Sequence, residues 1–319
     1  MKENRKEILV TGGAGFIGSH LVEELLENNY KVTIVDNFDP FYSKDIKLKN
    51  ISGVINSPYL KLIDLDILDL EALFTQLTGS YEVIVHLAAK AGVRPSIEDP
   101  IAYQDVNVKG TQNMLEFARH KNIKQFVFAS SSSVYGTNIN FPWKESDVSL
   151  KPISPYASTK ISGELLGHVY SHLFGIRFIA LRFFTVFGPR QRPDLAIHLF
   201  SKKILNNEAI NFFGNGSTRR DYTYVADTIH GIVNAIQYTR TPYEVFNLGN
   251  HQTVSLSEMI QTLESVFNKK AIIKYLPEQM GDVPITFADI FKAEQLLNYM
   301  PRTGFRQGVI NFKNWLDTQ

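Results

Sequence analysis

The chain has 319 residues, which is enough for one large domain or two ordinary domains with a substantial core. Its 33 Lys and Arg and 32 Asp and Glu leave a net charge of +1 without a basic block, so nucleic acid and membrane are not expected as main partners. The absence of cysteine excludes disulfides, thiolate metal sites and cysteine nucleophiles, and it suits a cytoplasmic location. The polar N-terminus lacks a signal-peptide pattern, and no apolar run approaches the roughly 20 residues of a membrane helix.

A glycine-rich turn near the N-terminus is the first pattern that indicates a function. A short apolar run leads into this turn, and residues 21–26 follow it with the apolar spacing of a helix. Gly12, Gly15 and Gly18 fit the pattern GxxGxxG, and Gly13, Gly15 and Gly18 fit GxGxxG. Such glycines let the turn close and let its backbone approach a diphosphate, which the free N–H groups of the helix N-terminus then bind.

A carboxylate follows the second predicted strand. The apolar run 31–35 ends at Asp36, eighteen residues after Gly18. A carboxylate at the tip of this strand can accept hydrogen bonds from both ribose hydroxyls of an adenine nucleotide, and it would repel a 2′-phosphate. The sequence therefore predicts NAD rather than NADP. The alternative, a glycine-rich turn of some other α/β protein, is disfavoured because turn, strand and acid agree.

Strand-like and helix-like segments alternate through most of the chain. This order predicts an α/β fold with a parallel sheet that helices cover on both faces. Ligands of such sheets bind at the carboxyl ends of the strands, so the residues that follow each strand are candidates for the site. After the first two, the predicted strands are 59–63, 83–87, 125–129, 176–183 and 244–248, and the predicted helices include 68–77, 108–119 and 157–173.

The loops after the third and fourth predicted strands carry candidates for cofactor binding. Asp66 and Ile67 offer a carboxylate and an aliphatic side chain that suit an adenine, although an ordinary loop with a capping acid fits equally well. Ala88 lies among small residues, against which a cofactor can approach the backbone. Lys90 either faces a diphosphate or is a solvated lysine.

Polar residues continue further along this edge of the predicted sheet. Arg94 is a candidate anion ligand, and Asn107 stands where it could cap the next helix. Four consecutive serines, 130–133, follow the fifth strand and offer hydroxyl groups to a polyhydroxylated ligand. The alternative for the serines is a polar turn.

A tyrosine and a lysine begin the helix predicted at 157–173. Tyr156 and Lys160 are four positions apart and share one helix face. A free tyrosine has a pKa near ~10, but a neighbouring ammonium and the positive charge of an oxidised nicotinamide would stabilise the phenolate. The YxxxK pattern alone is often a chance match. Its position after the glycine turn, Asp36 and the serines favours a catalytic base.

Together these motifs resemble the extended short-chain dehydrogenase/reductase family, in particular its NAD-dependent nucleotide-sugar epimerases. The resemblance implies a Rossmann-type, doubly wound parallel sheet of about seven strands and a smaller C-terminal α/β domain. We expect residues 1–182 with about 223–250 to bind NAD, and residues 183–222 and 251–319 to bind the nucleotide sugar. The matching segments are 11–18, 86–89, Ser131, Tyr156 with Lys160, 213–214 and 219–222.

The resemblance also implies roles for single residues. Ser131 matches the hydroxyl that contacts the substrate, Tyr156 the base, and Lys160 the lysine that binds the nicotinamide ribose and lowers the tyrosine pKa. The other implied cofactor contacts are Gly12, Gly15, Phe16, Ile17, Gly18, Asp36, Asp66, Ile67, Ala88, Lys90 and Asn107. The implied substrate contacts are Arg94, Ser132, Thr185, Arg192, Phe213 at the uracil, Arg220 at the diphosphate, and Asp282. No metal site is expected.

The segment after the strand at 176–183 bears on the identity of the sugar. Epimerases of neutral UDP-glucose usually carry asparagine at the position of Thr185, whereas Thr185 with Arg192 and Asp194 is similar to the UDP-glucuronate 4-epimerase pattern. A guanidinium and a hydroxyl suit a C6 carboxylate, although Arg192 could instead pair with Asp194 on a surface loop. Related dehydratases and decarboxylases have a glutamate where this chain has Ser133, so an acid for proton transfer at C5 or C6 is missing.

The resemblance therefore predicts C4 epimerisation of a UDP-sugar, UDP-glucuronate above all, through a 4-keto intermediate with NAD tightly bound and regenerated. The alternatives are a UDP-glucose or UDP-N-acetylglucosamine 4-epimerase, a dehydratase or decarboxylase, a net sugar reductase, and a non-catalytic NAD-binding sensor. The helices predicted at 108–119 and 157–173 match those through which relatives dimerise, so a homodimer is implied by resemblance.

Overall fold

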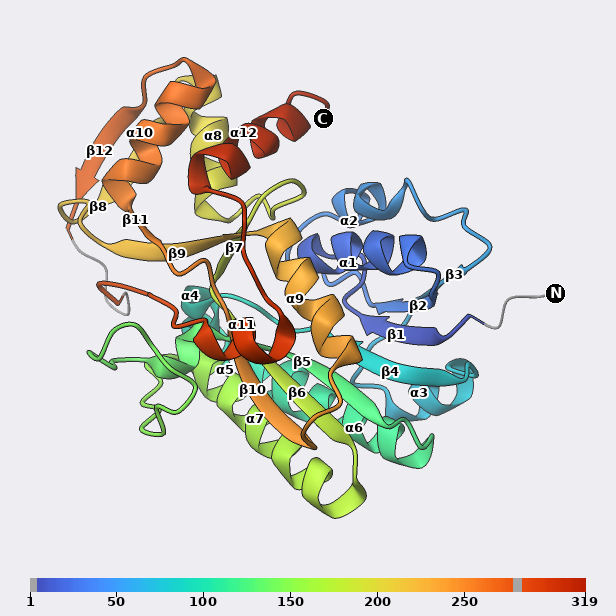
Figure 1. Ribbon diagram of the computed structural model, residues 1–319. Coiled ribbons are helices and arrows are strands. Elements are labelled where there is room, and N and C mark those ends of the chain that lie inside the picture. Colours follow the sequence, from blue (N-terminus) through green and yellow to red (C-terminus); the bar gives the residue numbers. More distant parts are fainter. Residues whose placement is uncertain (1–4, 278–282) are drawn as a thin grey trace.

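A parallel sheet of seven strands forms the centre of the protein, in the order β10-β6-β5-β4-β1-β2-β3. The computed structural model describes residues 5–277 and 283–319 (Figure 1). Neighbouring strands of this sheet pair in parallel throughout. The strands are β1 (Glu7–Thr11), β2 (Lys31–Asp36), β3 (Leu60–Asp64), β4 (Tyr81–His86), β5 (Gln125–Ser131), β6 (Arg177–Phe183) and β10 (Tyr243–Leu248).

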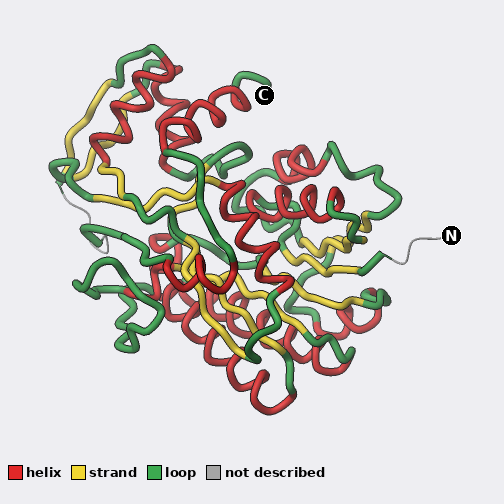
Figure 2. The backbone as a smooth tube through the Cα atoms, viewed as in Figure 1, coloured by secondary structure: helices red, strands yellow, loops and turns green. Residues whose placement is uncertain are grey.

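Helices cover both faces of the sheet, and Figure 2 shows them on either side of the strands. The first layer contains α1 (Phe16–Glu27), α2 (Lys44–Ile51), α9 (Val225–Gln237) and α11 (Phe291–Leu297). The second layer contains α3 (Leu70–Gln76), α6 (Gly110–His120) and α7 (Pro155–Phe174). Each layer has its own apolar core because the strands between them are buried on both faces. Shorter helices lie in the loops at α4 (Val93–Glu98), α5 (Pro100–Gln104), η1 (Asp105–Lys109) and η2 (Ser132–Tyr135).

The C-terminal part of the chain adds two small sheets, at the upper left of Figure 1. One sheet has the order β11-β9-β7, and the other pairs β12 with β8. Three helices pack on them around a third core, which includes Phe187, Leu263 and Phe312. The elements are β7 (Thr185–Phe187), β8 (Ala209–Phe213), β9 (Arg219–Tyr224), β11 (Thr253–Ser255), β12 (Ile272–Leu276), α8 (Ala196–Asn206), α10 (Leu256–Phe267) and α12 (Phe305–Leu316).

The predicted α/β fold with its seven-stranded parallel sheet is confirmed, and the predicted strands lie within two residues of the observed ones.

The expectation that Asn107 could cap a helix is wrong. Asn107 lies inside η1, and the chain stays helical from α5 through η1 to α6. Within the described ranges, no helix is both long and apolar enough to span a membrane.

A buried histidine connects three elements beneath the carboxyl edge of the sheet. His86 ends β4, and its Nδ1 lies 2.7 Å from the Thr11 hydroxyl of β1, while its Nε2 lies 3.1 Å from the Thr111 hydroxyl of α6. The Thr11 hydroxyl also accepts a hydrogen bond from Ala88 N at 3.2 Å. The histidine therefore helps to fix the start of the loop after β4. Burial lowers the pKa of His86 to about 3, so the ring is neutral at neutral pH.

We expect the free energy of unfolding to fall as the pH drops below about 6.5, because the unfolded chain protonates His86 while the folded chain excludes that proton until the pH nears about 3. This group contributes a slope of about 1.4 kcal/mol per pH unit in that window. The free energy of unfolding in urea should therefore fall between about pH 7 and about pH 4 by more in wild type than in His86→Gln. A difference that stays constant over this range would contradict the assignment.

Candidate active site

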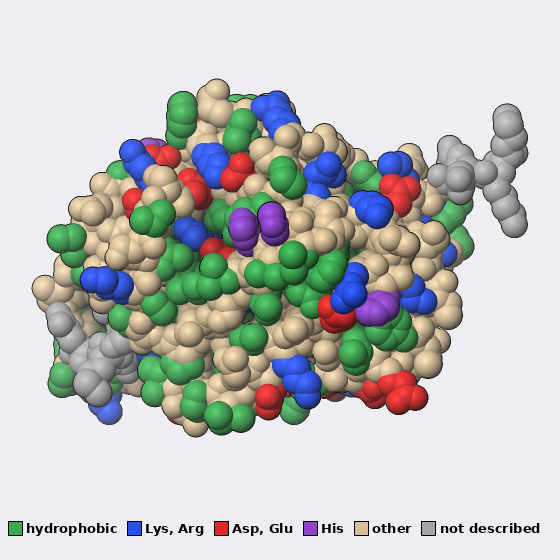
Figure 3. All heavy atoms as spheres, turned by 90° about the horizontal axis from the view of Figure 1, so that it is seen from below, with side chains coloured by type: hydrophobic (Ala, Val, Ile, Leu, Met, Phe, Trp, Pro, Cys, Tyr) green, Lys and Arg blue, Asp and Glu red, His purple; other side chains and the backbone are tan. Residues whose placement is uncertain are grey.

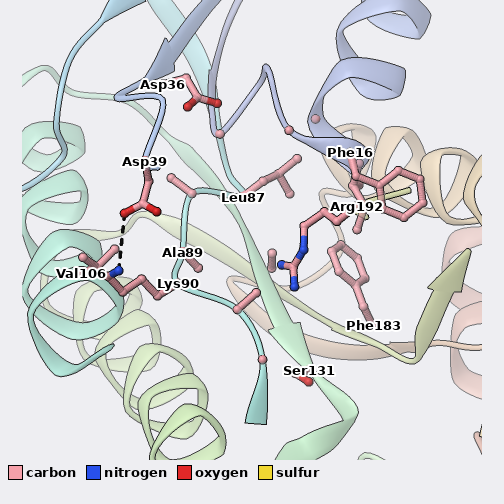
Figure 4. Close-up of a pocket in the computed structure, with 18 of the residues that line it drawn as sticks. Phe16, Asp36, Asp39, Leu87, Ala89, Lys90, Val106, Ser131, Phe183 and Arg192 are labelled. Carbon is pink, nitrogen blue, oxygen red and sulfur yellow. Dashed lines mark ion pairs between the residues drawn. The ribbon is translucent and has the colours of Figure 1, made fainter. Parts of the chain in front are cut away.

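A cavity of about 380 Å³ opens at the carboxyl ends of β1, β2, β4, β5 and β6. Figure 4 shows Asp36 and Asp39 at one end of it, Ser131 at another, and the Arg192 side chain reaching in near Phe16 and Phe183. This is the edge at which a parallel sheet binds ligands. The predicted site residues that line it are Gly12, Gly15, Phe16, Ile17, Gly18, Asp36, Asp66, Ile67, Ala88, Lys90, Ser131, Tyr156, Lys160, Thr185 and Arg192.

The glycine turn forms one wall of the cavity. Gly12 has a φ of +71°, which L side chains rarely adopt, and its N–H donates to Val35 O at 2.7 Å. A Cβ on Gly18 would collide with the Gly12 carbonyl oxygen, so the first turn of α1 can pack on β1 only when residue 18 is glycine. The N-terminal N–H groups of α1 thus lie at the cavity, where they suit a diphosphate.

Asp36 stands at the tip of β2 with its carboxylate held in place. One oxygen accepts from Ala14 N at 3.2 Å and the other from Phe38 N at 2.9 Å. Lys47 of α2 brings its ammonium to 3.7 Å from the same carboxylate, although both side chains are almost fully buried. Carboxylate oxygens can each accept further bonds, so Asp36 can still bind ribose hydroxyls. The sequence analysis did not find Lys47, because its distance along the chain from Asp36 matches no motif.

The loop after β4 forms the opposite wall. Lys90 forms an ion pair with Asp39 at 3.4 Å, which links this loop to the one after β2 (Figure 4). Asn107 does not line the cavity. Its amide oxygen accepts from Lys90 N at 2.8 Å, its nitrogen donates to Lys90 O at 2.9 Å, and it also donates to the Thr159 hydroxyl at 3.0 Å. Asn107 thus positions the loop that bears Lys90.

The adenine-side candidates also meet Asp36 in the cavity. Asp66 accepts from Asn37 Nδ2 at 2.9 Å and from Leu68 N at 2.8 Å, and Ile67 is nearly buried. A glycine cradle that tolerates no Cβ, a ribose-facing carboxylate and this acid–aliphatic pair fit an adenine dinucleotide. The residues present therefore suit NAD, with Gly12 to Gly18 at its diphosphate and Asp36 at its adenosine ribose.

Tyr156, Lys160 and Ser131 come together at the other end of the cavity. Tyr156 and Lys160 lie on the first turns of α7, which Ser154 caps by accepting from Ala157 N at 3.2 Å. Lys160 Nζ donates to the carbonyl of Ala129 at 2.7 Å and lies 5.8 Å from the centre of the Tyr156 ring. Helix α7 and the end of β5 thus position the base, its cationic neighbour and a hydroxyl at one place.

The predicted acidification of Tyr156 by Lys160 stays a prediction. Burial raises the pKa of Tyr156, and the groups that oppose this effect are the Ser131 hydroxyl and the Arg192 guanidinium. Burial also lowers the pKa of Lys160 to about 7. Desolvation disfavours the charged form of both groups. The spacing of the two residues along the chain does not reveal this free-energy cost.

Thr185 and Arg192 line the same cavity from β7 and the loop before α8. Arg192 pairs with Asp194 through both Nε, at 2.9 Å, and Nη2, at 2.7 Å. The sequence analysis gave an ion pair with Asp194 as the alternative role of Arg192, and the structure contains this pair. Asp194 is 40% exposed, whereas the Arg192 side chain is only 17% exposed and lies in the cavity wall, so the pair joins the surface to the cavity.

Several predicted substrate residues lie outside this cavity. Arg94 of α4 is 5.7 Å from the ring centre of Phe213 at the end of β8, so these two lie together. Ser132 is buried at the start of η2, and Arg220 of β9 donates to Arg219 O at 2.9 Å. Asp282 lies outside the described residues.

We expect Gly18→Ala to lower the affinity for NAD by at least about 100-fold, because the added methyl group would displace the Gly12 backbone from the diphosphate. Isothermal titration calorimetry on cofactor-stripped protein measures this change. Gly53→Ala is the matched control, since the nearest atom to its added methyl is 3.9 Å away in the Glu23 side chain. Unchanged NAD binding by Gly18→Ala would contradict the proposed diphosphate position.

Comparisons with known proteins identify the family of this chain. Residues 8–249 match the family model described as the NAD dependent epimerase/dehydratase family. A UDP-glucuronate 4-epimerase of Thermodesulfobacterium geofontis is 39% identical over 309 residues, which cover 96% of this chain and 95% of that protein. The crystal structure of UDP-glucuronic acid 4-epimerase from Bacillus cereus with UDP-glucuronic acid and NAD has a TM-score of 0.91 at 38% identity, covering 98% of this chain and 99% of that one. UDP-glucose 4-epimerase from Thermotoga maritima with UDP-glucose has a TM-score of 0.90 at 30% identity, covering 98% and 99%.

With the glycine turn, Asp36 and the Tyr156–Lys160 pair in one cavity, and with these matches over nearly its whole length, the chain belongs to the NAD-dependent epimerase/dehydratase family.

Proposed function

We propose that the protein is an NAD-dependent UDP-sugar 4-epimerase that interconverts UDP-glucuronate and UDP-galacturonate. The observation that carries this proposal is that Ser131, Tyr156 and Lys160 line the same cavity as Thr185 and Arg192. The first three residues can move a proton at a sugar hydroxyl, and the last two suit a carboxylate on the same sugar.

The reaction at C4 needs a base beside the hydroxyl group. When bound, NAD supplies reversible hydride chemistry at this carbon. Tyr156, as phenolate, takes the proton of the C4 hydroxyl and later returns it, and Ser131 hydrogen-bonds the reacting oxygen. The 4-keto sugar turns about its diphosphate link between these two events, so the configuration at C4 is inverted. Burial raises the pKa of Tyr156, while the Ser131 hydroxyl and the Arg192 guanidinium lower it and so favour the phenolate. An ammonium at Lys160 would add to this effect.

Arg192 has room for a substrate carboxylate. Asp194 occupies its Nε and Nη2, whereas Nη1 has no hydrogen-bond partner among the described residues. Asp194 therefore fixes the guanidinium and leaves Nη1 available to a ligand. Thr185 can donate its hydroxyl to the same carboxylate. Held in this way, the carboxylate is kept from aligning its C5–C6 bond with the C4 carbonyl, which limits loss of carbon dioxide from the β-keto acid intermediate.

Two relatives bear on the choice of sugar. The Thermodesulfobacterium geofontis and Bacillus cereus proteins act on UDP-glucuronate by name, and both are more similar in sequence than the Thermotoga maritima UDP-glucose enzyme. A UDP-glucose or UDP-N-acetylglucosamine 4-epimerase remains the second candidate, because the fold and the Tyr156 site are common to both. Arg192 is the residue that favours the uronate.

The same proposal includes a homodimer in the cytoplasm. Helices α4, α5 and α7 pack against one another, and they carry the exposed apolar residues Ile97, Ile101, Leu165, Val169 and Leu173. Figure 3 views the molecule from below, and hydrophobic side chains lie between scattered charged ones on this face. A second copy of the chain would cover these side chains. Sedimentation velocity measures the oligomeric state directly.

We expect the purified protein, without added NAD, to convert UDP-glucuronate to UDP-galacturonate, because NAD is regenerated in each turnover and stays bound. Chromatographic separation of the two uronates measures the product. Faster turnover of UDP-glucose or UDP-N-acetylglucosamine in the same assay would favour the second candidate. A requirement for added NADH would indicate a net reductase instead.

We expect Arg192→Ala to lower kcat/KM for UDP-glucuronate by about 10- to 100-fold, the loss of one or two charge-assisted hydrogen bonds, with a much smaller change in NAD affinity. Arg190→Ala is the matched control, since Arg190 pairs with Glu23 at 2.7 Å and does not line the cavity. Equal use of UDP-glucuronate by Arg192→Ala and wild type would refute the carboxylate role.

Tyr156→Phe should lose turnover while it keeps NAD, because the phenol is needed for proton transfer and the cofactor contacts of the glycine turn are unchanged. Steady-state rates and the NAD content of the purified variant measure the two effects. Full activity in Tyr156→Phe would show that another group is the base. The non-catalytic sensor is excluded if wild type turns over and this variant does not.

A further inference from the structure

The loop that carries Arg192 connects β7 to α8 and is closed by short-range hydrogen bonds. Gln191 N donates to Gly188 O at 3.2 Å, and Leu195 N donates to Arg192 O at 3.2 Å. Both bonds join residues three apart in the sequence, as in tight turns, so they shape the loop without attaching it to the rest of the protein. Contacts with other elements therefore set the direction in which the Arg192 side chain leaves the loop.

Two helices hold this loop. On one side, two side chains of α1 contact Pro189 and Arg190. On the other side, His198 of α8 brings its Nδ1 to 2.6 Å from Gln191 O. The Gln191 carbonyl belongs to the peptide group that also contains the Arg192 nitrogen. Because a peptide group is planar, a bond that fixes this oxygen also fixes the backbone from which the Arg192 side chain starts.

His198 is a buried hydrogen-bond donor. Its ring lies edge-on to Phe312 and Trp315 of α12, with ring centres 5.5 Å and 5.8 Å away. Burial lowers the pKa of His198, which favours the uncharged ring. A carbonyl oxygen can only accept a hydrogen bond, so Nδ1 carries the ring proton and donates it to Gln191 O.

Packing alone does not account for a histidine at this position. The Nε2 atom of His198 is buried and has no hydrogen-bond partner within residues 5–277 and 283–319. A phenylalanine ring would fill the space between α8 and α12 without placing this polar atom in an apolar environment. The contribution that only a donor can make is the bond to Gln191 O.

The far end of the Arg192 side chain is held within the same loop. Asp194 accepts from Nε and Nη2, so the guanidinium is fixed relative to the loop. A contact outside the loop, with the half-exposed ring of Phe41 at 5.1 Å, is weak. If the loop turns, Arg192 and Asp194 turn with it, and the guanidinium leaves its place in the cavity wall.

We propose that His198 is a positioning residue that sets the preference of the site for a carboxylated sugar, by holding the peptide group before Arg192. The proposal rests on the proposed function, in which Arg192 binds the C6 carboxylate of UDP-glucuronate. His198 does not line the cavity, so it acts through Arg192. Without the donor, the Gln191 carbonyl loses its partner, and we expect the loop to turn until this oxygen finds another donor.

The test measures the preference for the carboxylate in a Tyr156→Phe background, in which bound sugars are not turned over. Isothermal titration calorimetry of the NAD-loaded protein gives the ratio of the dissociation constants of UDP-glucose and UDP-glucuronate. His198→Phe keeps a packed ring and removes the donor, and His198→Leu removes it too if His198→Phe fails to fold. We expect either variant to lower the ratio by about 5- to 10-fold, the loss of one hydrogen bond, with NAD affinity unchanged.

Further variants separate positioning from packing. His198→Asn places an amide nitrogen near the position of Nδ1, so it should keep most of the wild-type ratio although it lacks the ring. Ser201→Ala is the matched control, because Ser201 is fully buried on the same helix and its hydroxyl has no partner in the described part of the chain. With Arg192→Ala already present, His198→Phe should lower the ratio no further, since the two residues act in series.

An unchanged ratio in the donor-free variants would overturn the proposal. An equal loss with and without the Arg192 side chain would also overturn it, because His198 would then act elsewhere. A loss in His198→Asn as large as that in His198→Phe would show that the ring, and not the hydrogen bond, is what matters.

A measurement without substrate separates this proposal from the proposed function. Isotope labelling of arginine nitrogen lets NMR observe the Arg192 Nε–H group, which Asp194 holds, and Arg192→Lys assigns its signal. We expect the signal to shift in His198→Phe and to stay in place in Ser201→Ala, and an unchanged signal in His198→Phe would contradict the proposal. A shift in a protein that binds UDP-glucose as tightly as UDP-glucuronate would reject the proposed substrate and keep the role of His198.

Discussion

The desolvation of Tyr156 and Lys160 at one end of the cavity is the constraint on which the proposed chemistry depends. In the proposed reaction Tyr156 loses a proton and Lys160 keeps one, yet burial opposes the charged form of both. Fixed protein groups, rather than solvent, favour the two charged forms. Ser131 and Arg192 favour the phenolate, and Glu164 favours the ammonium. Because these groups are already in place, little reorganisation is needed when the proton moves.

Arg192 connects substrate choice with this charge balance. The same guanidinium that suits a uronate carboxylate also lowers the pKa of Tyr156. Asp194 holds it by two hydrogen bonds, so its orientation does not depend on the substrate. A variant at this position should therefore affect proton transfer as well as binding, and its kcat and KM effects report the two roles separately.

Much of the fold and of the cofactor site could be predicted from the sequence. Hydrophobic periodicity located the strands and helices, and the spacing of Gly12, Gly15, Gly18 and Asp36 has a direct geometric meaning. The sequence analysis did not find Glu164, Arg182 or Lys47. Glu164 stands one turn after Lys160, so helical spacing could have indicated it, but its partner Arg182 comes from a strand that only the fold brings near. Desolvation of Tyr156 likewise depends on tertiary burial, which no local pattern reports.

The most direct measurement of the central claim follows the hydrogen on C4. UDP-glucuronate carrying deuterium at C4 is incubated with the protein in ordinary water, and the product is examined by NMR. If the hydride is taken up and returned within one cavity while Tyr156 exchanges only the hydroxyl proton, UDP-galacturonate keeps its deuterium at C4. Product that has replaced this deuterium with solvent hydrogen, at a rate equal to its formation, would contradict the account.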